Sequence, residues 1–212
     1  MNSSFDPSLP SPFRTPEQRR QERHDKREAV LRAAVRMFNA RGFHATSLED
    51  VAASLGISKP TLYHYLGNKD QVLLECVKRG LSELRKAADD AADMPGNGLD
   101  RLRIFLRRYA EVNMDDFGRC VIRTGDEALS DDSAMRFRAL KSEIDQAMRA
   151  LVEAGMADGS IAAGDVKLVS FTLAGALNWP ARWHTPDGAL PSSEIAAAMV
   201  DVLTAGLAPR AA

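Results

Sequence analysis

The sequence has little of what membrane-bound, disulfide-bonded or sheet-rich proteins need. No apolar run is long enough to cross a bilayer, and no basic-then-apolar signal segment opens the chain. Two cysteines, Cys76 and Cys120, stand far apart, which favours free buried thiols in a reducing cytosol over a disulfide. Aromatic residues make up 6% of the 212 residues, which argues against a large sheet. We therefore expect a cytoplasmic, helical protein that does not engage a membrane.

The chain also lacks the short motifs that mark common enzymes and metal sites. It contains no GxGxxG, Walker, HExxH or CxxC motif. Its four histidines do not have metal-ligand spacing: they are His24, His44, His64 and His184. We expect no catalytic residues, no metal and no cofactor, although the sequence alone does not exclude a catalytic site assembled from distant residues.

Charged residues are plentiful but unevenly placed. The formal net charge is -1, yet residues 14–86 hold 15 Lys and Arg against 9 Asp and Glu. Residues 87–212 hold 13 Lys and Arg against 19 Asp and Glu. A basic N-terminal third on an acidic remainder suggests two tasks, one of which is the binding of a polyanion.

Helical periodicity and stop signals divide the chain into about nine helices, with no convincing strand pattern. Residues 1–16 are rich in proline and serine, and we expect them to form a disordered tail. The predicted fold is all-α, with three N-terminal helices followed by a larger helical region. The predicted helices cover residues 17–41, 46–55, 59–66, 69–91, 99–114, 117–129 (interrupted at Gly125), 133–154, 165–184 and 192–207.

The second and third of these helices, joined by a tight glycine turn, predict a helix-turn-helix. Thr46 followed by Glu49 has the pattern of a capping box at the start of the first of the two. Gly56 supplies a turn backbone that a Cβ would resist, and Ser58 caps the second helix. The second helix is then free to present polar residues to a DNA groove: Lys59, Thr61, Tyr63 and His64.

Over residues 27–74 the sequence resembles the TetR family of bacterial transcription repressors. The resemblance implies a DNA-binding domain over residues 17–68 and a ligand-binding and dimerisation domain over residues 69–212. It also implies three partners, namely a double-stranded DNA operator, a small-molecule effector and a second copy of the chain. The residues that carry it are Ala33-Ala34, Phe38, Gly42-Phe43, Thr46-Ser47, Val51-Ala52, Leu55-Gly56-Ile57-Ser58, Thr61-Leu62-Tyr63-His64-Tyr65, Asn68-Lys69-Asp70 and Leu73-Leu74.

Seven residues are the candidates for DNA contact. Tyr63 and His64 are expected to touch phosphates or bases, the alternative being an ordinary exposed surface. Lys69 begins a helix, where backbone N–H groups and an ammonium together suit a phosphate. The Thr46 hydroxyl caps its helix and is an even candidate for reaching a phosphate as well. The set is Thr46, Ser58, Lys59, Thr61, Tyr63, His64 and Lys69.

The long apolar helices of the C-terminal region predict a cavity for an effector. Pro180 is expected to kink or end the helix that carries Trp179 and Trp183, which would open room for a ligand. Plain core packing is the alternative for each apolar residue, and a salt bridge is the alternative for Arg182. The candidate ligand-binding residues are Phe105, Tyr109, Met148, Phe171, Trp179 and Arg182, with Arg108 as a second arginine for a charged end.

The segment from Asn178 to His184, followed by Pro186-Asp187-Gly188, is similar to family members that sense acyl-CoA thioesters. The resemblance therefore implies an acyl-CoA or a fatty acid as effector. Free fatty acids and many aromatic compounds also fit the general expectation of an apolar molecule with one polar end.

The last two helices are expected to build a four-helix dimer interface. Residues 165–184 are too apolar to stand exposed, and 192–207 offers Ile195, Met199 and Val202 beside small alanines. The leading hypothesis is thus a ligand-responsive, DNA-binding homodimer, most often a repressor. The alternatives are an interaction protein whose helix-turn-helix no longer binds DNA, and an all-α hydrolase or transferase, for which no motif is present.

Overall fold

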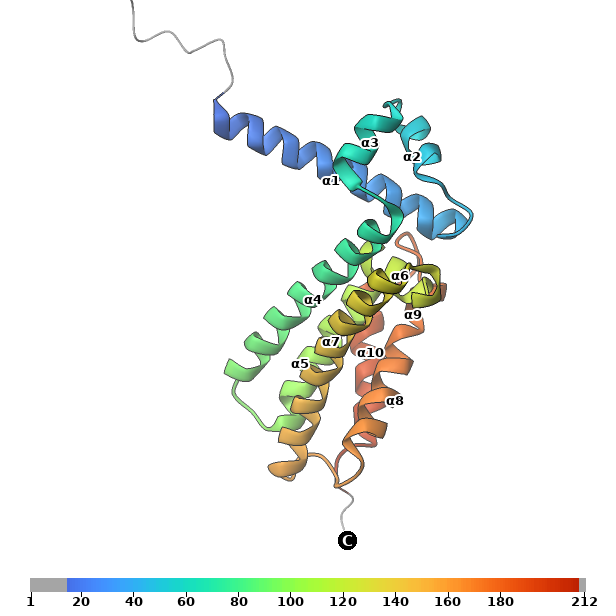
Figure 1. Ribbon diagram of the computed structural model, residues 1–212. Helices are drawn as coiled ribbons and strands as arrows, with labels where there is room; N and C mark the ends of the chain where they lie inside the picture. Colours follow the sequence, from blue (N-terminus) through green and yellow to red (C-terminus); the bar gives the residue numbers. More distant parts are fainter. Residues whose placement is uncertain (1–14, 210–212) are drawn as a thin grey trace, which may run out of the picture.

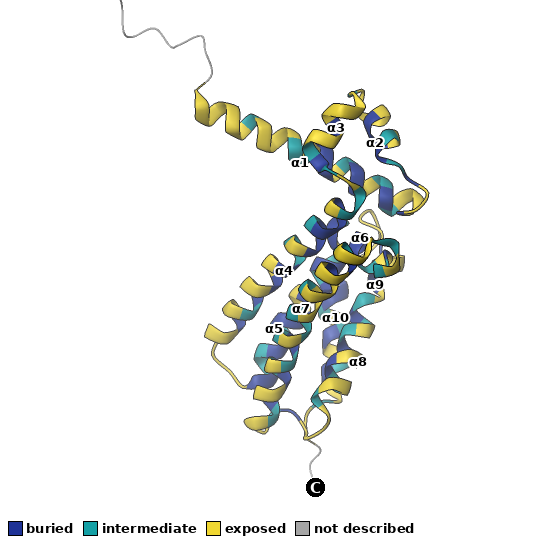
Figure 2. Ribbon diagram, in the orientation of Figure 1, coloured by how far each residue is buried: buried dark blue, intermediate teal, exposed yellow. Residues whose placement is uncertain are grey.

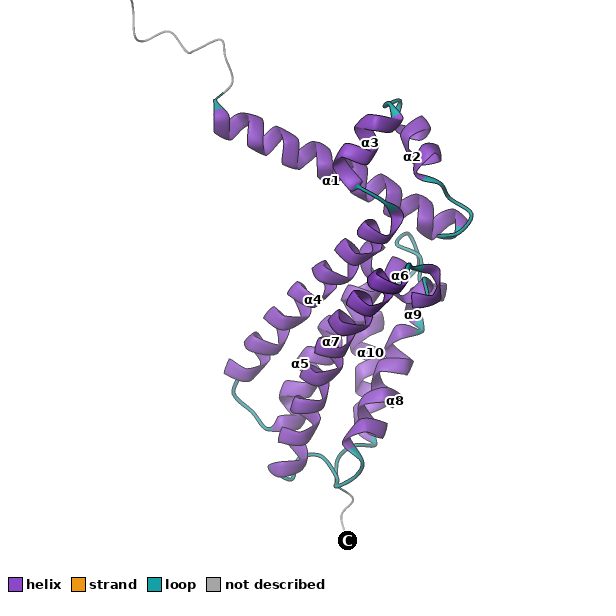
Figure 3. Ribbon diagram, in the orientation of Figure 1, coloured by secondary structure: helices purple, strands orange, loops and turns teal. Residues whose placement is uncertain are grey.

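Helices make up all the regular secondary structure of residues 15–209, the part of the chain that this computed structural model describes (Figures 1 and 3). The all-α prediction is confirmed, and the ten α-helices and one 3-10 turn of this part are close to the nine helices expected. They are α1 (Pro16–Arg41), α2 (Leu48–Leu55), α3 (Lys59–Leu66), α4 (Lys69–Asp93), α5 (Gly98–Met114), α6 (Asp116–Arg123), η1 (Asp126–Ala128), α7 (Asp131–Ala157), α8 (Val166–Asn178), α9 (Pro180–Trp183) and α10 (Ser192–Ala205).

The first helix begins earlier than the sequence predicted. Thr15 and Gln18 form a capping box, in which the Thr15 hydroxyl accepts from the Gln18 N–H at 3.1 Å and the Gln18 side chain accepts from the Thr15 N–H at 2.9 Å. Pro16 fits the first turn because its missing N–H needs no partner there. The predicted disordered tail over residues 1–16 is therefore wrong for its last two residues, and the rest of it lies outside the described residues.

The helix that opens the helix-turn-helix has a different cap from the predicted one. The Ser47 hydroxyl accepts from the Asp50 N–H at 3.0 Å, and the Asp50 carboxylate accepts from the Ser47 N–H at 2.9 Å. The predicted box of Thr46 and Glu49 is wrong, because Thr46 is buried and its hydroxyl donates to the Gly42 carbonyl at 2.9 Å. Two overlapping matches to one capping pattern exist in the sequence, and the burial of Thr46 decides between them.

The other predicted turn residues end and begin the helices of the upper part of Figure 1. Gly42 and Gly56 end α1 and α2 with φ angles of 93° and 63°, conformations that favour glycine. Ser58 and Asn68 cap α3 and α4, each accepting a hydrogen bond from a backbone N–H three residues on. These caps fix the short helices α2 and α3 as a helix-turn-helix packed on α1.

Two buried clusters hold the helices together (Figure 2). The first cluster joins α1, α2 and α3 to the start of α4 and to α6, and includes Leu31, Val35, Phe38, Leu62, Leu73, Cys76, Phe117 and Cys120. The second cluster joins α4, α5, α7, α8 and α10, and includes Leu102, Phe105, Leu106, Met148, Leu177 and Val200. Burying each large apolar side chain stabilises the fold by about 1.5–3 kcal/mol. The first cluster therefore fastens the helix-turn-helix to the helices below it.

Candidate functional site

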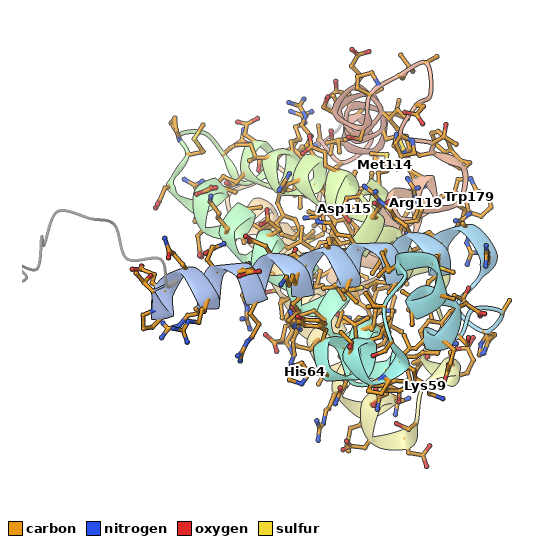
Figure 4. The ribbon with its side chains drawn as sticks, turned by 90° about the horizontal axis from the view of Figure 1, so that it is seen from above. Lys59, His64, Met114, Asp115, Arg119 and Trp179 are labelled. Atoms are coloured by element: carbon orange, nitrogen blue, oxygen red, sulfur yellow. The ribbon has the colours of Figure 1, made fainter. Side chains whose placement is uncertain are left out.

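Helix α3 turns its polar side chains away from the first cluster. Leu62 and Leu66 are buried in that cluster, whereas the polar residues between and before them are exposed. Figure 4, which looks down on the helix-turn-helix, shows Lys59 and His64 at the outer edge of α3. Five of the seven predicted DNA-contact residues thus lie on one exposed surface: Ser58, Lys59, Thr61, Tyr63 and His64.

A carboxylate of α2 restrains two of these residues. The Lys59 Nζ lies 2.5 Å from the Glu49 carboxylate, and the Tyr63 hydroxyl donates to the same carboxylate at 3.1 Å. The hydrogen bond from Lys59 lowers the pKa of the Glu49 carboxyl below its usual value, and the hydrogen bond from Tyr63 also lowers it. The exposed pair therefore compensates the Lys59 charge in the free protein, a role for Glu49 that the sequence did not suggest.

The other two predicted DNA-contact residues are placed differently. Thr46 is buried and its hydroxyl is used inside the protein, so it does not face a phosphate. The Lys69 Nζ donates to the Phe43 carbonyl and lies 4.4 Å from the centre of the Phe43 ring. Partial burial lowers the pKa of the Lys69 ammonium. Lys69 reaches a phosphate only after its side chain leaves Phe43.

A groove of about 600 Å³ runs between the first turns of α2 and α4, with Tyr63 at its side. Both helices have eight residues or more and point their N-termini towards this groove, so their positive dipole ends favour a phosphate there. The sequence analysis missed two polar residues of the groove, His44 and Asn68, although Asn68 carries a recognisable capping signal.

A second cavity, of about 440 Å³, lies between α5, α6, α7 and α8. Three of the predicted effector residues line it, namely Tyr109, Met148 and Phe171. The sequence analysis missed most of its other walls because they come from four helices far apart in the chain. The additional residues are apolar (Val121, Ile122, Ile144, Ala174 and Gly175) and polar (Asn113, Lys141, Asp145 and Asn178).

One end of this cavity carries a small polar cluster. The Asn178 side-chain oxygen accepts from the Tyr109 hydroxyl at 2.9 Å and from the Asn113 amide at 2.9 Å. Burial raises the pKa of the Tyr109 hydroxyl, which therefore stays a donor. The Asn178 amide nitrogen has no hydrogen-bond partner among the described residues, so the cavity offers one hydrogen-bond donor to a ligand.

Three predicted effector residues lie outside the cavity. Phe105 is fully buried in the second cluster. Trp179 is 61% exposed at the edge of the molecule (Figure 4), because it lies about 80° around the helix from Phe171. Arg182 is exposed, and its carbonyl accepts a hydrogen bond from Arg123 at 3.4 Å. The predicted break at Pro180 is confirmed, since α8 ends at Asn178 and α9 begins at Pro180.

Arg108, the second arginine considered for a charged effector end, is also elsewhere. It pairs with Glu83 and with Glu111, and the hydrogen bond to Glu83 raises its pKa. The cationic side chain that does line the cavity is Lys141 of α7.

The outer face of α8 and α10 carries exposed apolar side chains. Leu168 and Phe171 of α8 are exposed, and Val202 of α10 is 76% exposed. Met199 is half-buried, whereas Ile195 is buried in the second cluster, so the prediction of Ile195 as an interface residue is wrong. We define the apolar face as Leu168, Phe171, Trp179, Trp183 and Val202; exposed patches of this kind mark interaction surfaces.

Searches for metal and membrane features apply to residues 15–209 only. Within this part, no three His, Cys, Asp or Glu side chains converge to hold a metal ion. No helix in the same range is long and apolar enough to span a bilayer.

Solved structures with the same fold cover nearly all of these helices. The TetR-family regulator PfmR from Thermus thermophilus has 30% identity and a TM-score of 0.74, over 85% of this chain and 99% of that one. AibR, crystallised with isovaleryl coenzyme A and operator DNA, has a TM-score of 0.71 at 24% identity, over 84% of this chain and 98% of that one. The second likeness is one of fold.

Sequence comparisons give the same family. The HTH-type transcriptional repressor KstR2 of Mycolicibacterium smegmatis is 25% identical over 185 residues, covering 86% of this chain and 90% of that protein. The model of bacterial regulatory proteins of the tetR family matches residues 30–76, and the model of the tetracyclin repressor-like C-terminal domain matches residues 95–207. The chain therefore belongs to the TetR family and is a DNA-binding transcriptional regulator, not an enzyme.

Proposed function

We propose that this protein is a homodimeric repressor that leaves its operator when a small, largely apolar effector occupies the cavity between α5, α6, α7 and α8. The observation that carries the proposal is the position of α6. Val121 and Ile122 of α6 line the cavity, while other residues of the same helix pack against α1 of the DNA-binding unit. An effector that displaces α6 therefore also displaces α1.

Direct polar contacts support this link between α6 and α1. The Asp116 carboxylate pairs with Arg36 at 3.1 Å, and the Asp116 carbonyl accepts from the Asn39 amide at 2.8 Å. Arg123, at the other end of α6, donates to the Asn39 carbonyl at 2.9 Å. An effector changes DNA affinity only by binding the two arrangements of these helices with different affinity.

On the DNA side, α3 is the recognition helix in the proposal. In a dimer the two copies of α3 enter successive major grooves, about 34 Å or a multiple of that distance apart. Ser58, Lys59, Thr61, Tyr63 and His64 then face the DNA, and Lys69 joins them at a phosphate once it leaves Phe43. Thr46 supports the loop before α2 from inside and makes no contact. The apolar face of α8 and α10 supports pairing with a second copy.

The cavity supports an effector class. Its volume of about 440 Å³ suits a small molecule, and most of its walls are apolar. The free Asn178 amide and the Lys141 ammonium favour a carbonyl or carboxylate end, whereas Asp145 is already paired with Arg149 at 2.7 Å. We therefore propose a fatty acid or the acyl group of an acyl-CoA as effector.

A gel shift with the DNA upstream of the protein's own gene tests the proposal. The parent should bind this DNA and release it when a matching acyl-CoA or fatty acid is added. The same ligand should raise the melting temperature by mass action. If no acyl compound does either, while a hydrophobic cation or a sugar does both, the effector class is wrong and the repressor assignment stands.

A cavity-filling variant separates effector binding from DNA binding. Ala174→Phe should retain operator binding and lose both ligand-induced release and thermal stabilisation, because the added ring occupies the cavity. Ala150→Phe makes the matched change on the exposed side of α7 and should behave as the parent does. Normal release by the Ala174→Phe variant would place the effector elsewhere.

A further inference from the structure

The first turns of α1 extend past the rest of the protein (Figures 1 and 4). Residues 15–26 are exposed apart from the half-buried Glu22, and the first buried residue of α1 is Val30. At 1.5 Å per residue, the stretch 16–26 spans about 17 Å. Short helices gain most of their stability from tertiary packing, which this stretch lacks within the protomer.

Charges are sorted onto two sides of this projecting stretch. At 100° per residue, the basic residues fall within about 120° of one another. The acidic residues fall on the opposite side. We call the basic set the basic stripe; it consists of Arg19, Arg20, Arg23, Lys26 and Arg27, and the acidic set is Glu17, Glu22, Asp25 and Glu28.

The basic stripe faces the same side of α1 as the helix-turn-helix. Steps of three and four residues lead from Arg20 through Arg23 and Arg27 to Leu31 and Ala34, which are buried in the first cluster with residues of α2 and α3.

The acidic side continues in the other direction. It leads from Asp25 to Arg32 and Arg36, which contact Phe117 and Asp116 of α6. The stripe therefore points to the DNA side of the protomer, and the acidic side points to the C-terminal helices.

Two arginines at the outer end of the stripe are uncompensated. Lys26 pairs with Glu22 at 2.7 Å, and Arg27 lies 3.6 Å from Glu75. Arg20 and Arg23 have no carboxylate partner within residues 15–209, although their helix carries acidic residues on its other side. A guanidinium in this state is suited to a phosphate, which it binds through two parallel hydrogen bonds.

We propose that the basic stripe binds the phosphate backbone of operator DNA beyond the base pairs that α3 reads. The inference rests on the proposed DNA-binding function and extends its footprint. In the view of Figure 4, α1 passes α3 and reaches well beyond its end, so the stripe continues the charged surface of the helix-turn-helix. Duplex DNA carries about one negative charge per 1.7 Å of axis, which gives the stripe a ligand along its whole length. Such contacts add affinity without reading sequence.

Two duplexes test the proposal. One ends at the base pairs that a footprint with the isolated operator assigns to α3, and the other adds about ten base pairs of arbitrary sequence on each side. Binding is measured by anisotropy over a salt series. The parent should show a steeper log–log salt slope on the long duplex, by roughly 0.9 for each added phosphate contact. Arg20→Gln/Arg23→Gln should remove that difference and bind the short duplex as the parent does.

A matched control carries the same loss of charge far from the DNA. Lys86→Gln/Arg101→Gln lies at the lower end of the C-terminal helices and should keep the parent's slopes on both duplexes. Glutamine keeps a good helix propensity, and circular dichroism verifies that α1 is retained. Equal slopes for the parent on the two duplexes, or an undiminished difference in the α1 variant, would overturn the proposal. In both cases normal binding to the short duplex leaves the repressor function standing, whereas no binding by the parent removes that function itself.

Discussion

The Nδ1 atom of His184 accepts a hydrogen bond from the Arg119 guanidinium at 3.3 Å, and both side chains are buried where α6 meets the segment after α9. Arg119 also donates to the Met114 carbonyl at 2.9 Å, and no carboxylate among the described residues pairs with it. Burial, followed by the Arg119 charge, lowers the pKa of His184 below its ordinary value. The native state therefore needs the neutral imidazole.

This contact predicts a loss of stability in mild acid. Because the folded pKa of His184 is lowered, the unfolded chain binds the proton more readily. The stabilisation is complete above the unfolded pKa of about 6.5 and is lost as the pH falls below it towards the folded pKa. His184→Gln keeps an acceptor for Arg119 but does not titrate, so its melting temperature should fall less between about pH 7.5 and 5.5 than that of the parent. His24→Gln, an exposed change on α1, serves as control. A parallel decline in all three proteins would contradict the assignment.

The Glu49 carboxylate predicts a gain of DNA affinity on its removal. Glu49→Gln frees Lys59 and removes a negative charge that would face the phosphates. Anisotropy at low salt should show tighter binding, with a salt slope steeper by roughly one per protomer. Glu153→Gln, on the exposed side of α7, makes the same charge change without effect. Unchanged slopes for Glu49→Gln would mean that Lys59 does not meet the DNA.

The apolar face predicts the oligomeric state. Val202→Glu should halve the mass observed by sedimentation while circular dichroism stays helical, because Val202 packs against nothing essential in its own protomer. Met135→Glu changes an equally exposed apolar residue on α7 and should leave the dimer intact. Ile195→Ala acts by another route: it removes buried volume and should cost about 2–5 kcal/mol of folding stability. A parent that sediments as a stable monomer at low concentration sinks the dimer proposal.

The two cysteines predict chemical silence in the native protein. Cys76 and Cys120 are free and buried, as the sequence analysis expected, and the neighbouring Cys120 thiol together with burial raises the pKa of Cys76. A raised pKa suppresses the reactive thiolate. Ellman's reagent at neutral pH should therefore label neither thiol until denaturant is added, when both react. Rapid labelling of the folded protein would show that α4 and α6 separate in solution.

The helices could be predicted from the sequence because their ends are written in local chemistry. Gly42, Gly56 and Asn68 act within one turn of their own position, and each appears where it was expected. The choice between Thr46 and Ser47 as cap could not be made locally, since both satisfy the pattern and only tertiary burial distinguishes them.

The cavity could be predicted only in part, for a related reason. Phe105 and Tyr109 are four residues apart on one side of α5, and both are apolar enough for a core. Which of them borders the cavity depends on where α8 packs, and that position is set by contacts between distant helices. Lys141, Asn113 and Asn178 were missed because single polar residues on a helix carry no sign of the space they face.

The first buried cluster has a consequence for exchanging parts between regulators. Phe117, Cys120 and Val121 of α6 complete the same core as Leu31 and Phe38 of α1. A chimera that joins residues 15–68 to the effector domain of another family member would meet a foreign α6, with mismatched volumes where these side chains interlock. Such exchanges should succeed only when the recipient's α6 is recoded together with the donor's helix-turn-helix.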